Sequence, residues 1–431
     1  MKYKKNLCNF FLFYYISIRF IKKFGKMTKA LLLLSLCLSL NIYGQTEEEI
    51  NRLADKIHSE IITIDTHTDT PLRIQRGNFD LGSRNNPYSS NSKLDLPRMI
   101  EGGLDAVYFA LYVGQGKRDN AGNEKAIQVI ARLHYLVDSV LIAHSDKVSL
   151  AKSCSDFQTI KKEGKLAIAL GIENGYGIGN DISLLKKYYD LGVRYLTLCH
   201  TKNNDICDSS TDPEGAEHNG LSEFGTRVVK EMNKLGILID LSHASDKTVE
   251  DVLAISKVPV FASHSCARFF NNNPRNLSDD LIKKIAEKGG VIQVCFFSGY
   301  LRELPTNTTR DSLLRNLRQR YSNFQNLSDS LSRLAEKEWY EIEKKYPGNL
   351  ATVSDIVDHI DHIVKIAGID YVGIGTDFDG GGGVTGAFDV SEMKNITKEL
   401  IRRGYVIEEI EKIWGGNYLR VLGEAEKKSK F

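Results

Sequence analysis

The sequence predicts an α/β protein, a (β/α)8 barrel of the TIM type with a helical insertion between its seventh and eighth strands. Eight short apolar runs recur along the chain, helix-like segments separate them, and most of the runs end in polar residues. Apolar runs without polar alternation are typical of parallel strands that are covered on both faces. The runs are ITID (62–65), DAVYFALYV (105–113), LAIALGIE (166–173), VRYLTLCH (193–200), GILIDLSH (236–243), PVFASH (259–264), GVIQVCFF (290–297) and YVGIGTD (371–377).

Amphipathic segments between these runs are predicted to form the helices of the barrel. Residues 221–235 place apolar side chains on one face, and Ser222 is a suitable N-cap for this helix. Residues 246–255 and 278–288 are also predicted to be helical, opened by Asp246 and Ser278 respectively. The regular alternation of strand and helix is what favours a barrel over other α/β folds.

The interval 298–370 is too long for a single crossover between two neighbouring strands. We expect an insertion there, helical from Ser328 to Lys345, and then a final helix from Ser354 to Ala367 before the last strand.

Residues 1–44 are predicted to be an export signal, and residues 45–431 the barrel domain. The first 44 residues hold eight Lys or Arg and no Asp or Glu, and basic residues precede the apolar run 31–40. Ile42 and Gly44 suit the −3 and −1 positions of a cleavage site. The predicted localisation is therefore periplasmic or secreted, by way of a cleaved signal.

Two alternatives for the leader stay open. Met27 is a second candidate start, because a signal that begins there has normal proportions, although the aromatic stretch 10–20 argues against it. A membrane-anchored start is the other alternative. Lipidation at Cys37 is disfavoured, because Leu36 is too large for the residue before a lipidated cysteine.

Composition excludes several classes of protein. The chain has 431 residues, of which 42% are hydrophobic and 26% charged, so disorder, collagen and a polytopic membrane protein are excluded. Without residues 1–44 the net charge changes from +2 to −6, which does not suit a nucleic-acid partner. The five cysteines that remain show no CxxC spacing. In an oxidising compartment their odd number predicts at least one thiol that is unpaired or bonded to another chain.

Polar residues at the ends of the runs form the predicted functional site. In this barrel the C-terminal ends of all strands meet at one mouth, so residues far apart in sequence converge there. The candidates are His67, Asp69, Glu173, His200, His243, His264 and Asp377.

The residue types at these ends are typical of a metal centre. His67 and Asp69 lie two residues apart and point to the same side of an extended chain, so both can contact one ion. Glu173 ends an apolar strand, where a carboxylate is paired or metal-bound. With His243 and His264 the donor set exceeds the needs of one catalytic zinc, and it favours two metals about 4 Å apart, bridged by Glu173. Taken singly, each residue also fits a structural histidine or a buried salt bridge.

At these residues the sequence resembles the renal (membrane) dipeptidase family of zinc peptidases, whose fold is a (β/α)8 barrel related to the amidohydrolases. The resemblance covers about residues 50–425, in family order. The matching stretches are IDTHTDTP (64–71), GIENGYGIG (171–179), LGVRYLTLCHTKNN (191–204), NGLSEFGTRVVKEMNKLGILIDLSHAS (219–245), FASHSCARFFNNNPRNLSDD (261–280), YVGIGTDFDG (371–380) and GGNYLRVL (415–422).

The resemblance implies a role for each matching residue. His67 and Asp69 correspond to the ligands of one zinc, His243 and His264 to those of the other, and Glu173 to the carboxylate that bridges the two.

Three further residues acquire roles by resemblance. His200 matches the histidine that contacts the substrate and stabilises the tetrahedral intermediate. Arg275 matches the arginine that binds the substrate carboxylate, and Asp377 the aspartate that shuttles protons with a bridging hydroxide. Taken alone, Arg275 also fits a surface arginine, Asp377 a cap of the turn 380–383, and His200 a structural histidine.

Two positions depart from the family pattern. Asn174 stands where the family often has glycine after the bridging glutamate, and Phe297 stands where it often has tyrosine. The loss of that hydroxyl removes one substrate contact and leaves the substrate preference open.

The expected function is zinc-dependent hydrolysis of dipeptides by a metal-bridging hydroxide, in a protein that is a homodimer by resemblance. A rival enzyme keeps the metals and acts on N-acyl amino acids, lactams or lactones. A degenerate metal-binding scaffold is the non-enzyme alternative, and it predicts a missing ligand or proton shuttle, whereas none is missing. Stereochemistry and the native metal stay open, because the same ligands accept cobalt or manganese.

Overall fold

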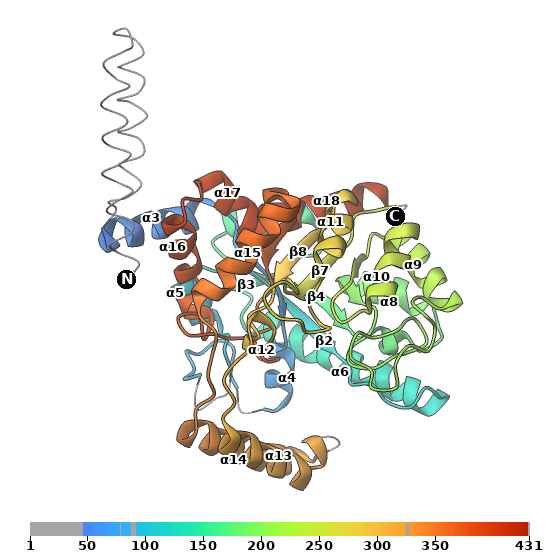
Figure 1. Ribbon diagram of the computed structural model, residues 1–431. Helices are drawn as coiled ribbons and strands as arrows, with labels where there is room; N and C mark the ends of the chain where they lie inside the picture. Colours follow the sequence, from blue (N-terminus) through green and yellow to red (C-terminus); the bar gives the residue numbers. More distant parts are fainter. Residues whose placement is uncertain (1–45, 78, 88–91, 325–326, 430–431) are drawn as a thin grey trace. The chain divides into compact units, whose positions relative to one another are not determined.

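The computed structural model describes residues 46–429 apart from 78, 88–91 and 325–326. The described residues divide into two units, with the boundary between Leu53 and Ala54. The predicted leader, residues 1–44, lies outside the described residues. The second unit contains the sheet and its surrounding helices (Figure 1).

The described residues form one parallel sheet of nine strands. Neighbouring strands pair in the order β1, β2, β4, β5, β6, β7, β8 and β9, and β3 pairs with β4 outside this path. The strands are β1 (Ile64–Thr68), β2 (Ala106–Tyr112), β3 (Val148–Leu150), β4 (Leu166–Glu173), β5 (Val193–Thr197), β6 (Leu238–Asp240), β7 (Phe261–Ser265), β8 (Val291–Val294) and β9 (Val372–Ile374).

The last strand returns to the first, which closes the sheet into a barrel. The Asp69 N–H donates to the Phe378 carbonyl at 2.8 Å, and the Asp377 N–H donates to the His67 carbonyl at 3.0 Å. Each of the eight predicted runs overlaps one strand of this closed path, so the predicted eight-stranded parallel barrel is confirmed. Strand β3 was not predicted, because its short segment contains Ser149 and only Val148 is buried, so it lacks the apolar run of a covered strand.

Helices follow most strands and surround the barrel (Figure 1). The α-helices are α3 (Glu47–Glu60), α4 (Thr70–Gln75), α5 (Leu96–Gly102), α6 (Asn120–Ala143), α7 (Cys154–Lys162), α8 (Leu184–Leu191), α9 (Glu223–Leu235), α10 (Asp246–Ile255), α11 (Asp279–Glu287), α12 (Ser298–Leu301), α13 (Thr308–Arg320), α14 (Asp329–Lys345), α15 (Val353–Ala367), α16 (Lys394–Arg402), α17 (Ile407–Glu411) and α18 (Asn417–Lys428). Shorter helical turns are η1 (Gly175–Ile178), η2 (Ser322–Phe324), η3 (Ile369–Tyr371), η4 (Val390–Glu392) and η5 (Lys412–Gly416).

Side-chain caps fix where several helices begin. The Ser222 side chain accepts from the Gly225 N–H, so the predicted cap of α9 is confirmed. The predicted helix 246–255 is confirmed, since α10 begins at Asp246 and the Ser245 side chain before it accepts from the Thr248 N–H. Asp246 lies in the first turn, where a negative charge is favourable near the helix N-terminus.

Between β8 and β9 the chain forms α12, α13, α14 and α15. Helices α13 and α14 lie side by side (Figure 1) and enclose a small apolar cluster with Leu317, Tyr321 and Ala335. Glu336 on α14 forms ion pairs with Arg76 and, at 3.0 Å, with Arg73 on α4. The helix pair is thereby bonded to the helix that follows β1.

Aromatic rings fill the barrel interior below the strand ends. Ring centroids of Tyr195 lie 5.3 Å from Tyr108 and 5.2 Å from Phe261, and Tyr418 lies 5.3 Å from Tyr108. Gly171 on β4 is required here, because a Cβ atom at this position would lie 2.0 Å from the Tyr195 ring. This packing directs the Tyr195 hydroxyl toward the C-terminal ends of the strands, where it reaches His67.

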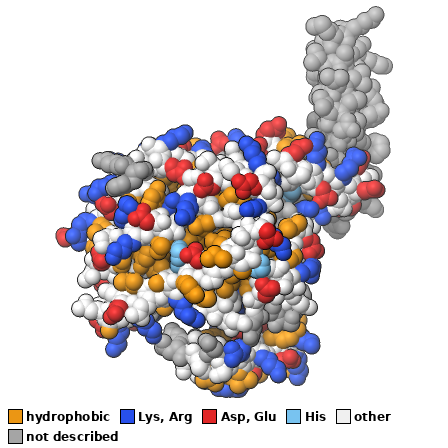
Figure 2. Space-filling view, turned by 180° about the vertical axis from the view of Figure 1, so that it is seen from behind, with side chains coloured by type: hydrophobic (Ala, Val, Ile, Leu, Met, Phe, Trp, Pro, Cys, Tyr) orange, Lys and Arg blue, Asp and Glu red, His pale blue; other side chains and the backbone are white. Residues whose placement is uncertain are grey.

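The surface carries charges of both signs. On the face drawn in Figure 2, basic and acidic side chains are interspersed, with hydrophobic side chains between them. Apolar groups are a usual part of a protein surface.

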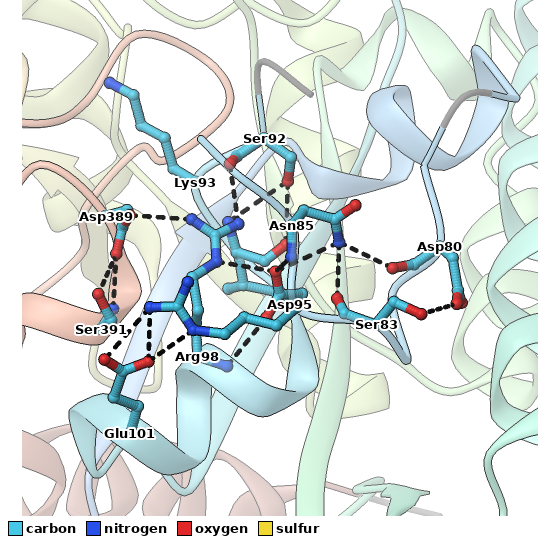
Figure 3. A network of polar contacts seen from close by, with 12 residues as sticks. Asp80, Ser83, Asn85, Ser92, Lys93, Asp95, Arg98, Glu101, Asp389 and Ser391 are labelled. Atoms are coloured by element: carbon cyan, nitrogen blue, oxygen red, sulfur yellow. Dashed lines mark hydrogen bonds and ion pairs between the residues drawn. The ribbon is translucent and has the colours of Figure 1, made fainter. Parts of the chain in front are cut away.

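A buried ion-pair network ties α5 to the loop before α16 (Figure 3). The Arg98 side chain is fully buried and donates to Asp95 at 2.7 Å, to Asp389 at 2.9 Å and to the Ser92 carbonyl at 2.9 Å. Removal of one partner from such a network leaves buried charge uncompensated, which is strongly destabilising.

We expect Arg98→Met to lower the free energy of unfolding by about 3–5 kcal/mol, because Asp95 and Asp389 lose their shared cation. Urea unfolding of the metal-free protein measures this. Arg84→Met is the matched control, since Arg84 pairs with Glu101 on the exposed surface and its loss should cost at most about 1 kcal/mol. Equal effects of the two substitutions would contradict the prediction.

Candidate metal centre

Strand β1 brings His67 to the centre of the mouth, and Asp69 follows it. All five residues of β1 are buried, and the His67 side chain is inaccessible to solvent. His67 Nδ1 lies 2.9 Å from the Tyr195 hydroxyl, which leaves Nε2 facing Glu173 at 3.6 Å. The contact at Nδ1 thus fixes the orientation of the ring, as is usual for a metal-binding histidine.

Glu173 ends β4 and is surrounded by four imidazoles. Glu173 is 2% exposed. The distances from a carboxylate oxygen to Nε2 are 3.1 Å for His243, 3.6 Å for His67, and 3.7 Å for both His200 and His264. Three strand ends beyond β1 and β4 therefore contribute to one cluster, as the barrel topology predicts.

His243 and His264 follow neighbouring strands, and their Nε2 atoms lie 3.0 Å apart. His264 Nδ1 is 2.8 Å from the Ser263 hydroxyl, which donates to the Asp240 carboxylate at 2.7 Å. His243 has a positive φ of 69°, a conformation that histidine adopts more readily than most residues.

The charges of this cluster depend on one another. Burial acts to raise the pKa of Glu173, but His67 and His200 outweigh it and hold this pKa well below its usual range. Burial alone would lower the pKa of His67, yet the Glu173 carboxylate raises it to about 10. In the metal-free centre His67 thus keeps a proton that must leave when its Nε2 binds a metal.

The other donors of the cluster are shifted mainly by burial. Burial lowers the pKa of His243 and His264 well below its usual range, and the positive charge of Arg275 acts in the same direction. Burial and the Glu173 charge raise the pKa of Asp69 well above its usual range. Two neutral imidazoles are therefore available as ligands at neutral pH.

The unpartnered atoms of the cluster fit a metal. Buried His67 Nε2 and Asp69 Oδ1, which belong to one group of donors with Glu173, have no hydrogen-bond partner. Such atoms are costly in a protein interior unless an ion or another group satisfies them. The nitrogen and carboxylate donors, without thiolate, suit zinc and also cobalt or manganese.

The donors fall into two groups that share Glu173. One group is His67, Asp69 and Glu173, and the other is Glu173, His243 and His264, each with ligand atoms within 4.8 Å of one another. A third group of the same extent joins His67 and His264 to Asp377. The first two groups match the division into two zinc sites that the resemblance implies.

His200 and Arg275 border this cluster. The His200 ring centroid lies 4.2 Å from that of His243, and 21% of its side chain is exposed, so it lies between the donors and the solvent. Arg275 is buried, contrary to the surface alternative, and donates to the His264 carbonyl at 3.3 Å while its Nε has no partner.

Asp377 lies after β9 with a positive φ of 59°. Its backbone carbonyl accepts the N–H groups of residues 380, 381 and 382 at 3.2, 3.0 and 2.7 Å. The glycine turn is thus closed by the backbone of Asp377, which leaves the carboxylate directed at the cluster. Burial raises the pKa of this carboxylate to about 7.

All of the residues predicted for the site therefore lie together, and sequence reasoning missed those that support them. Tyr195, Ser263 and Asp240 hold the Nδ1 sides of two histidines. Tyr112, at the end of β2, packs edge-on against His200 with centroids 4.9 Å apart. Asp240 could have been identified from the sequence, because it is a charged residue inside the apolar run 236–243.

The two departures from the family pattern are accommodated differently. Asn174 has a positive φ of 84°, its side chain donates to the Val113 carbonyl at 3.0 Å, and it accepts from Tyr176 N–H and Asn204. Asn174 therefore has a structural role, since its side chain stabilises the backbone after β4. Phe297 is 37% exposed and packs on Tyr300 with centroids 4.5 Å apart.

The chain is similar to several dipeptidases. The chain is 33% identical to dipeptidase tcpJ of Claviceps purpurea over 338 residues, which is 77% of this chain and 69% of the relative. It is 31% identical to dipeptidase ataJ of Aspergillus terreus, over 86% of this chain and 87% of the relative.

Solved structures share the fold. The crystal structure of the probable dipeptidase PvdM from Pseudomonas aeruginosa is 32% identical, with a TM-score of 0.76, and the match covers 89% of this chain and 100% of that one. Residues 51–430 match the membrane dipeptidase family, peptidase family M19. The chain therefore belongs to the membrane dipeptidase family and is a metallopeptidase of the dipeptidase type.

Proposed function

We propose that this protein hydrolyses the peptide bond of dipeptides with two zinc ions, one held by His67 and Asp69, the other by His243 and His264. Glu173 contributes to both sites. The observation that carries this proposal is the sharing of Glu173 by two adjoining groups of buried donors. When bound, two zinc ions polarise a carbonyl and lower the pKa of a water molecule to near neutrality.

The chain's own residues have distinct tasks in this reaction. His200, beside the donors and partly open to solvent, stabilises the negative charge that develops on the carbonyl oxygen. Asp377 takes a proton from the attacking water and passes it to the leaving amine. Arg275 holds the free carboxylate of the substrate, since its buried guanidinium matches a carboxylate in charge and shape.

Three further properties belong to the same proposal. Export by the N-terminal signal accounts for the basic and apolar leader. A homodimer follows from the resemblance to the family. Helices α13 and α14 form the insertion of the barrel between its seventh and eighth strands.

The test of the function is amine release from a panel of dipeptides. The panel contains L,L and L,D dipeptides together with their N-acetylated forms, and the purified protein carries zinc. We expect cleavage of free dipeptides and none of the blocked ones. Cleavage of the N-acetylated members alone would replace this function by that of an amidohydrolase, and cleavage of none by folded, metal-loaded protein would exclude the dipeptidase proposal.

Metal removal is expected to abolish this activity and to lower the melting temperature. Buried donors that bind metal only in the folded state stabilise that state by mass action, so the metal-free protein unfolds at a lower temperature. Chelation followed by calorimetry measures the shift, and elemental analysis counts the metal per chain. An unchanged melting temperature with full loss of metal would contradict the site.

A further inference from the structure

Tyr300, on the short helix α12, lies beside Arg275. The guanidinium carbon of Arg275 is 5.2 Å from the centre of the Tyr300 ring. Burial raises the pKa of Tyr300 to about 12, and the positive charge of Arg275 acts against this increase. At neutral pH the phenol therefore keeps its proton and is available as a hydrogen-bond donor next to the guanidinium.

Two asparagines fix this arrangement. The loop that carries Arg275 is bonded to the backbone of α12, because Asn276 donates to the Tyr300 carbonyl at 2.8 Å and Asn271 donates to the Gly299 carbonyl at 2.7 Å. The guanidinium and the phenol thus belong to segments that are held together without a substrate.

Arg275 has unused bonding capacity. It is 4% exposed, its Nε has no partner, and its Nη2 donates to a backbone carbonyl, that of His264. Within the described part of the chain, no carboxylate forms an ion pair with it. The Asp377 carboxylate is near enough to interact with this charge but forms no ion pair with it, so the buried guanidinium keeps donors for an anion.

Phe297 cannot take part in binding that anion through a hydrogen bond. Its ring packs on that of Tyr300, with the centroids 4.5 Å apart, and it is partly exposed. Of these two neighbouring aromatic residues, Tyr300 alone has a hydroxyl that can donate a hydrogen bond to the anion.

We propose that Tyr300 is a specificity-determining residue whose hydroxyl, together with Arg275, binds the free carboxylate of the substrate. Phe297 forms the apolar wall beside it. This inference rests on the proposed function and extends it, because it assigns the carboxylate contact that the phenylalanine at position 297 cannot make. A hydrogen bond to a charged group discriminates well between a substrate with a carboxylate and one with a neutral amide at that end.

The first experiment compares Tyr300→Phe with wild type on a dipeptide and on the same dipeptide with a C-terminal amide. We expect KM for the free acid to rise about tenfold or more with kcat within about twofold, and the parameters for the amide to stay unchanged. Tyr135→Phe, on the exposed surface of α6, is the matched control. Equal changes for acid and amide, or no change for either, would overturn the inference.

A second experiment separates this inference from the proposed function. Calorimetry measures binding of a dipeptide analogue with a phosphinate in place of the amide, as the free acid and as the methyl ester, to zinc-loaded protein. If wild type turns over no dipeptide, the proposed function fails. The carboxylate-binding role of Tyr300 is still supported in that case if the Tyr300→Phe variant binds the acid about tenfold more weakly than wild type and binds the ester equally well. Equal binding of the acid by both proteins, or none by wild type, would overturn it.

Discussion

Glu173→Gln is expected to lower the zinc content from two ions per chain to one or none, and to lower kcat/KM by about a thousandfold or more. Glu173 is the one residue common to both donor groups. A neutral carboxamide offers less charge to two cations, and its nitrogen cannot act as a ligand while it donates hydrogen bonds. Elemental analysis and steady-state kinetics on the same sample measure the two effects together.

Asp389→Asn is the control for loss of a buried carboxylate. Asp389 lies in the Arg98 network and outside the donor groups, so this variant should lose stability and keep two zinc ions. If Glu173→Gln retained both ions with wild-type activity, the bridging role would be excluded. If Asp389→Asn lost zinc to the same extent, the loss would reflect unfolding in both variants.

The barrel was predictable because its strands are buried on both faces. Strand β4 is apolar along its length and is buried at all eight residues, and the predicted run 166–173 has the same bounds. The bounds of strand β6 are harder to predict, since only residues 238–240 of the run 236–243 pair with neighbouring strands. Its chain turns after Asp240 to present His243, and a hydropathy pattern does not show where pairing stops.

The donors of the site were predictable for the same topological reason. A polar residue at the end of an apolar run is conspicuous, and the barrel brings all such ends to one mouth. The supporting residues lack this signal. Tyr195 reads as a core aromatic, and its contact with His67, at 2.9 Å, joins positions 128 residues apart.

Side-chain chemistry at the mouth is also decided by partners that the sequence does not reveal. Taken alone, Arg275 has the sequence context of a surface residue before a helix, yet it is buried in the fold, where its loop is bonded to α12. The turn 380–383 reads as a motif that a side chain could cap, yet the backbone carbonyl of Asp377 closes it. In both cases the tertiary structure sets the environment of the charged group.

Asp377→Asn is expected to lower kcat by about a hundredfold to ten-thousandfold while zinc content and KM change little. This range is the usual contribution of a positioned group that transfers protons. The carboxylate lies within 4.8 Å of ligand atoms of His67 and His264, so it is close enough to the reaction to exchange a proton there. An asparagine of nearly the same size cannot accept that proton, and it keeps the backbone bonds that close the glycine turn.

The same proximity supplies the alternative that the measurement must separate. If Asp377 is instead a ligand, together with His67 and His264, the asparagine variant should lose zinc in proportion to its loss of activity. Elemental analysis of Asp377→Asn beside its kcat distinguishes the two roles. If the variant keeps two zinc ions and has a low kcat, Asp377 transfers protons. If the variant loses one ion, Asp377 is a metal ligand. Full activity with two ions would exclude both roles, and the proton would then have to travel through His200, whose side chain is the partly exposed imidazole beside Glu173.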